Sequence, residues 1–150
     1  MKRMAFVVCL LLSLSSVSWA ASLWTGTWVQ REPQQEGRLM MTIEEVGTGW
    51  KVTYKIAGQP PGSPVSTIVT QLDGKHAPFL IDGKPSEQTM AIKKIDSRHT
   101  VTVITFQGKQ AGISKAEISP DGKVLKIEND YTDSNSGGPG GKQIQYWDKQ

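Results

Sequence analysis

The sequence predicts an all-β protein, and three features of the residue pattern support this fold class. Residues 89–129 contain four short runs rich in β-branched residues, and tight turn signals separate them, as is typical of a β-meander. Residues 50–56 alternate between apolar and polar side chains, which predicts a half-buried strand. Beyond the first 20 residues, no window contains the i, i+3, i+4, i+7 apolar stripe of a long amphipathic helix.

Turn signals divide the chain into about nine or ten short strands. Pro33 lies in a polar connection, a Gly-Thr-Gly turn at 47–49 marks a hairpin, and a Gly/Pro cluster occupies 58–64. Residues 76–81 are less regular, and a glycine-rich loop at 133–141 precedes the last strand. The regular strands are expected at residues 23–30, 39–46, 50–56, 65–72, 89–96, 99–106, 110–118, 123–129 and 142–148. This number of evenly spaced strands favours a sandwich or an antiparallel barrel.

The first 20 residues have the pattern of a secretory signal peptide. Lys2 and Arg3 precede an apolar run of about ten residues, and Ser18 and Ala20 are small residues at the positions before a cleavage site. The run is shorter than the roughly 20 apolar residues that span a bilayer. We therefore expect cleavage after Ala20, a single domain at 21–150 without a membrane span, and a periplasmic or secreted location.

Removal of the predicted signal peptide would change the cysteine content and the net charge of the chain. The only cysteine, Cys9, lies in the predicted signal, so no disulfide is expected in the mature chain. Removing Lys2 and Arg3 leaves 15 basic against 14 acidic residues, a net charge near +1. This near-neutral balance, without a basic-aromatic stripe, predicts no nucleic-acid partner. No phosphate loop or dinucleotide motif is present, and we expect no cofactor.

Several short motifs together resemble a known group of proteins. Gly26-Thr27-Trp28 at the first strand resembles the Gly-x-Trp signature of lipocalin-like barrels, and a Ser-Pro-Asp-Gly-Lys hairpin at 119–123 is similar to one in small exported bacterial proteins of unknown function. The resemblance implies an up-and-down antiparallel barrel that could hold a ligand. It also implies that Trp28 closes one end of the barrel as a structural residue. The chain lacks the disulfide pair and the C-terminal helix of true lipocalins.

Aromatic residues are the best candidates for ligand contacts. The mature chain is rich in large rings, which commonly fill a core. In a barrel with room inside, some of them would instead line a cavity for a small apolar ligand. The residues that we expect in such a site are Trp50, Tyr54, Phe79, Phe106 and Tyr146.

Catalytic and metal-binding patterns are weak. His76 and His99 are isolated, so neither predicts a zinc site. Ser114 lies in a Gly-Ile-Ser-Lys-Ala segment that loosely resembles a nucleophile elbow, but it sits in a predicted strand rather than in a strand-to-helix turn. We therefore expect a binding protein without catalytic residues or a bound metal.

Two other functions remain open from the sequence. One is a protein-interaction or inhibitor role through exposed loops at 58–64, 73–85 and 133–141. The protein partner is unknown. The more remote one is a hydrolase, which requires His76 or His99 close to a serine or a carboxylate.

Overall fold

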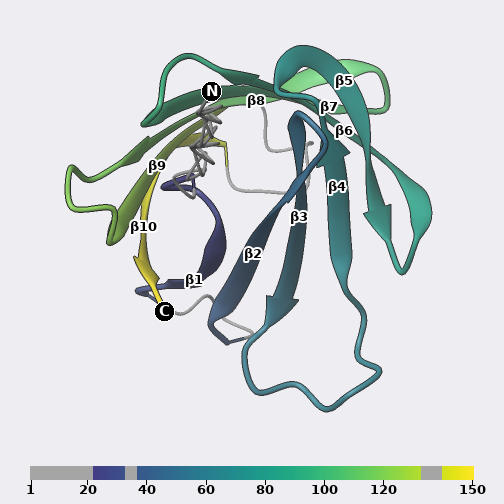
Figure 1. Cartoon of the computed structure of the whole chain (residues 1–150). Coiled ribbons are helices and arrows are strands. Elements are labelled where there is room, and N and C mark those ends of the chain that lie inside the picture. The colour runs from purple at the N-terminus through teal and green to yellow at the C-terminus, as the bar shows by residue number, and fades with distance from the viewer. Residues whose placement is uncertain (1–21, 33–36, 133–139) are drawn as a thin grey trace, which may run out of the picture.

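The computed structural model describes residues 22–32, 37–132 and 140–150, and there the chain forms ten strands (Figure 1). The predicted signal peptide at 1–20 and most of the glycine-rich loop lie outside the described residues. Within the described part, no helix has the length and apolar character needed to cross a membrane. The strands are β1 (Gly26–Gln30), β2 (Leu39–Val46), β3 (Gly49–Ile56), β4 (Ser66–Thr70), β5 (Asp73–Ile81), β6 (Lys84–Lys94), β7 (His99–Phe106), β8 (Lys109–Ile118), β9 (Val124–Tyr131) and β10 (Gly141–Lys149).

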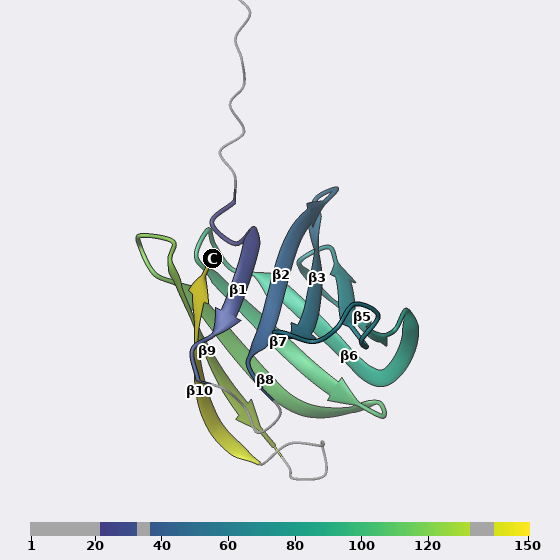
Figure 2. The same ribbon diagram turned by 90° about the horizontal axis from the view of Figure 1, so that it is seen from below.

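The strands form a closed antiparallel barrel with up-and-down order. Each strand pairs with its neighbours in the sequence, and β1 closes the sheet by pairing with β10 through Gln30 and Trp147 (Figure 2). The predicted fold class is therefore confirmed, including the meander, which forms β6 to β9. The pairing is weakest between β4 and β5, which are joined only through Ser66–Ile81 and Thr67–Leu80, so the rest of their facing edges lies outside the ladder.

The segment 73–85 is not the exposed loop that the sequence pattern predicted. Residues 73–81 form β5, and residues 84–85 already belong to β6. The β5–β6 pairing shifts register between Asp73 and His76 and again near Pro78, whose nitrogen cannot donate a hydrogen bond. These irregularities disrupt the sequence pattern of the strand but not the strand itself.

Tryptophan side chains pack at one end of the barrel, which we call the closed end. It is the end where β1 begins and where β2 joins β3. Trp24 lies just before β1, is almost fully buried and packs on Trp50, with 5.1 Å between the ring centroids. The Trp24 indole N–H donates to the Ser97 carbonyl (2.9 Å), and the Trp28 N–H donates to the Trp24 carbonyl (2.9 Å). These bonds fix the N-terminal segment across the closed end.

Candidate functional site: the barrel cavity

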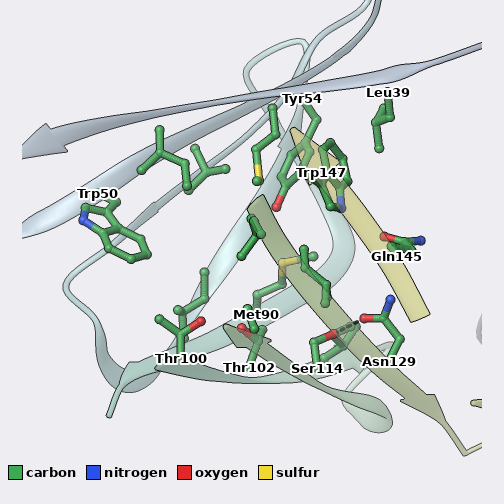
Figure 3. A pocket seen from close by; sticks show the side chains of 18 of the residues that line it. Leu39, Trp50, Tyr54, Met90, Thr100, Thr102, Ser114, Asn129, Gln145 and Trp147 are labelled. Carbon is green, nitrogen blue, oxygen red and sulfur yellow. Dashed lines mark hydrogen bonds between the residues drawn. The ribbon is translucent and has the colours of Figure 1, made fainter. Parts of the chain in front are cut away.

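The barrel contains a cavity of about 370 Å³. Strands β2 to β10 all contribute lining side chains, and Trp50 lies at the closed end of the cavity (Figure 3), together with Trp24, which packs on it. The lining reaches Leu39 and Tyr131, near the opposite end, which we call the loop end. For comparison, an engineered apolar cavity of about 150 Å³ is large enough to bind benzene. The barrel cavity is therefore large enough for a small organic molecule.

Most of the apolar lining comes from one side of the barrel, strands β2 to β6. Tyr54 and Phe79 lie side by side in this wall, with 6.1 Å between their ring centroids. The mainly apolar residues of this wall are Leu39, Met41, Ile43, Trp50, Val52, Phe79, Met90 and Ile92. Such a surface favours an apolar group, because contact with it removes apolar area from water.

The opposite wall, strands β7 to β10, contains a row of short polar side chains. Thr102 pairs with Ser114, and Ser114 pairs with Asn129, so the three occupy consecutive places across β7, β8 and β9. The Ser114 hydroxyl donates to the Asn129 Oδ1 atom. Thr100 and Gln145 lie next to this row in the lining (Figure 3). The cavity thus has a largely apolar side, where the polar groups are those of Ser66 and Tyr54, and a mixed side. On the mixed side the polar row lies among the apolar residues Ile104, Ala116, Leu125, Ile127 and Trp147.

No charged side chain is among the cavity-lining residues of the described chain. The titratable lining groups are the phenols of Tyr54 and Tyr131. Burial, together with the nearby Tyr131, raises the pKa of Tyr54 to about 12. Burial also raises the pKa of Tyr131 above its ordinary value. Both phenols are therefore neutral near pH 7, and the cavity presents no formal charge.

The raised pKa of Tyr54 predicts a loss of stability in alkali. The unfolded phenol ionises near pH 10, whereas the folded phenol keeps its proton to about pH 12. Between these values the folded state holds more protons, so the free energy of unfolding falls as the pH rises. We expect urea unfolding midpoints to fall between pH 9 and 11.5 by more in the wild type than in Tyr54→Phe. An equal fall of the midpoint with pH in the two proteins would contradict the raised pKa of Tyr54.

The structure brings three of the five predicted ligand contacts together. Trp50, Tyr54 and Phe79 line the cavity. Phe106 and Tyr146 are not among the lining residues. Phe106 is the last residue of β7, beyond a register shift between Ile104 and Thr105, and it lies at the loop end.

Tyr146 lies on the outside of the barrel. Its neighbours in β10, Gln145 and Trp147, line the cavity, so alternation turns the Tyr146 ring outward, where it is 41% exposed. The Arg31 guanidinium lies over this ring, 5.5 Å from its centroid, and also pairs with Asp148 at 2.6 Å. Tyr146 is therefore part of an outer-surface cluster.

The polar side of the cavity was missed by reasoning from the sequence. In β7, Thr100 and Thr102 face the cavity, whereas Val101 and Val103 alternate with them on the outer side. A rule that turns apolar residues inward and polar residues outward would place the two valines in the cavity and the two threonines outside. Pairing Thr102, Ser114 and Asn129 in one row requires the register of three strands, and no local sequence signal gives it.

The histidines lie away from the cavity. The His99 ring contacts the Asp96 carboxylate at 2.8 Å on its Nδ1 side and Glu117 at 3.5 Å on its Nε2 side. His76 contacts the Thr89 hydroxyl at 3.1 Å. In the part of the chain that the structure describes, neither imidazole is hydrogen-bonded to a serine, and Ser114 bonds Asn129 instead. A carboxylate thus orients His99, and among the described residues no serine is hydrogen-bonded to its ring.

Residues 58–64 form an exposed connection between β3 and β4. Of the three segments that the sequence pattern associates with protein interaction, 58–64 is the one that is fully described and forms a connection, since 73–85 is largely strand. Comparisons with known proteins add no assignment: no protein-family model, no curated protein and no solved structure matches this chain.

Proposed function

We propose that this protein binds a small, largely apolar ligand inside the barrel and acts as a binding protein rather than an enzyme. The observation that carries the proposal is the cavity of about 370 Å³ with its apolar wall on β2 to β6. Ligand sites are typically concave and mostly apolar, with a few polar groups that orient the ligand. The cavity has each of these properties.

The sequence supports a cellular location for this function. The pattern of residues 1–20 is that of a signal peptide, so we propose that the mature chain starts at Ala21 and acts in the periplasm or outside the cell. The resemblance to lipocalin-like exported barrels fits the same proposal. Mass spectrometry of the protein purified from the periplasm or medium tests it, and an intact Met1 on the exported protein would contradict it.

Filling the cavity tests the binding function directly. Ala116 lies on β8 in the cavity lining, between Thr100 and Ile127 on the neighbouring strands. Ala116→Phe places a ring in the space that a ligand would occupy. We expect the affinity for the neutral fluorescent probe N-phenylnaphthylamine to fall by about tenfold or more, because steric overlap removes the apolar contacts of the probe.

The matched control is Lys115→Phe, which adds the same ring at the adjacent, exposed position on the outside of β8. Its probe affinity should equal that of the wild type. Circular dichroism and thermal melting check that both variants remain folded. If the wild type does not bind the probe, or if both variants bind it equally well, binding inside the barrel is wrong.

A further inference from the structure

The two sides of the cavity differ in a way that specifies the chemistry of the ligand. Thr100 is 5% exposed and Asn129 is 6% exposed, so both are almost fully withdrawn from bulk water. A buried polar group without a partner costs about 1–3 kcal/mol, so most such groups in proteins are hydrogen-bonded. The hydrogen-bonding state of this wall is therefore informative.

The Ser114–Asn129 hydrogen bond orients the Asn129 amide. Since its Oδ1 atom accepts from Ser114, its Nδ2 group is left as a donor, and Figure 3 shows this nitrogen on the side that faces Gln145. Within the described residues, no hydrogen bond from the protein is found for the Asn129 Nδ2 atom or for the side chains of Thr100, Thr102 and Gln145. The indole N–H of Trp147, which lines the same wall, is buried without a partner. Donor and acceptor capacity thus remains free along one wall of the cavity.

The absence of charge from the described lining limits the ligand further. A carboxylate or an ammonium group would lose its hydration in this cavity without gaining an opposite charge. Burial raises the pKa of Tyr54 to about 12, so this lining phenol is neutral near pH 7. A neutral hydrogen-bonding group loses much less on entering the cavity, and it finds partners on β7 to β10.

We infer that the barrel selects a neutral molecule with an apolar body and one uncharged hydrogen-bond acceptor, such as a ketone, an ester or an amide. The acceptor lies against the Thr102–Ser114–Asn129 row and receives a hydrogen bond from the Asn129 amide. The apolar body lies against the wall formed by β2 to β6. This inference rests on the proposed binding function and goes beyond it, because it names the group that the site recognises.

Three naphthalene derivatives of similar size test the inference. They carry an acetyl, an ethyl or a carboxylate group at the same ring position. The acetyl group is a neutral acceptor, the ethyl group is apolar and the carboxylate is negatively charged. Competition with N-phenylnaphthylamine at neutral pH gives the three affinities. We expect acetylnaphthalene to bind about five- to tenfold more tightly than ethylnaphthalene, as one additional hydrogen bond allows, and naphthoate to bind most weakly.

Asn129→Leu removes the proposed donor and keeps a side chain of similar size. It should bring the affinity ratio of acetylnaphthalene to ethylnaphthalene close to one while it retains binding of ethylnaphthalene. The control is Asp130→Leu, at the adjacent, exposed position of β9, where alternation turns the side chain to the outside of the barrel; it should leave the ratio as in the wild type. A ratio is used because a general loss of packing would affect both ligands alike.

The possible outcomes distinguish a failure of the inference about ligand class from a failure of the proposed binding function. If naphthoate binds as well as or better than the ketone, or if Asn129→Leu leaves the ratio unchanged, the inference about ligand class is wrong while the binding function stands. If neither the probe nor any derivative binds the wild type, both proposals fail. The inference is supported if the affinities follow the expected order and if the ratio of acetylnaphthalene to ethylnaphthalene affinity falls to about one in Asn129→Leu but not in the control.

Discussion

Replacing Gly49 by alanine is expected to destabilise the barrel by about 3 kcal/mol or more, because the new methyl group has no space. A Cβ atom at this position would lie 1.8 Å from the Thr70 carbonyl oxygen and 2.8 Å from the Gln71 Cα atom. Both neighbours are backbone, so only a separation of β3 from the end of β4 relieves the overlap. Gly49 precedes Trp50, and we therefore expect the packing of Trp50 on Trp24 to loosen as well.

Urea unfolding monitored by circular dichroism measures the effect. The matched control is Gly47→Ala, two residues earlier in the same hairpin, where the space around a Cβ atom is open. Gly47 has a φ angle of +60°, so alanine there costs only the left-handed backbone penalty of about 1–2 kcal/mol. Equal unfolding midpoints for the two variants would show that β3 and β4 do not approach as closely as the structure indicates.

The sequence predicts the barrel well because its strands are local and consecutive. Tight turns at residues 47–49, 107–108 and 119–123 connect neighbouring strands, and each turn has a residue type suited to it. In an up-and-down barrel the strand order follows the chain order, so finding the strands nearly determines the topology. The exception is β5, where Pro78 and the register shifts weaken the strand pattern.

The cavity is much harder to predict, because it depends on which face of each strand turns inward. Along β10, Gln145 faces the cavity and Tyr146 faces solvent, although hydrophobicity alone suggests the reverse. Side chains alternate between the two faces along the whole strand. Which set faces inward is decided by the register with the neighbouring strands. A polar wall such as Thr102, Ser114 and Asn129 therefore emerges only when the strand pairing is known.

Trp28→Ala is expected to lower the free energy of unfolding by about 3–5 kcal/mol, the usual range for removing a buried tryptophan. Trp28 is 0% exposed and contacts both Trp24, just before β1, and Lys149, at the end of β10. Its indole N–H bonds the Trp24 carbonyl, and the Lys149 ammonium lies 5.1 Å from its ring centroid. Lys149 also donates to the Leu23 carbonyl at 2.8 Å. The substitution thus removes contacts that hold the N-terminal segment against β10.

The same change should weaken ligand binding, which separates Trp28 from an ordinary core residue. Trp28 does not line the cavity, but it positions Trp24, which does. If Trp24 moves off Trp50, the closed end opens and the affinity for N-phenylnaphthylamine falls. Tyr146→Ala, which removes an exposed ring from β10, should change stability by less than about 1 kcal/mol and leave probe affinity unchanged. A Trp28→Ala protein as stable as Tyr146→Ala would contradict the closing role of Trp28. Normal probe binding in a folded Trp28→Ala protein would show that Trp24 keeps its place without Trp28.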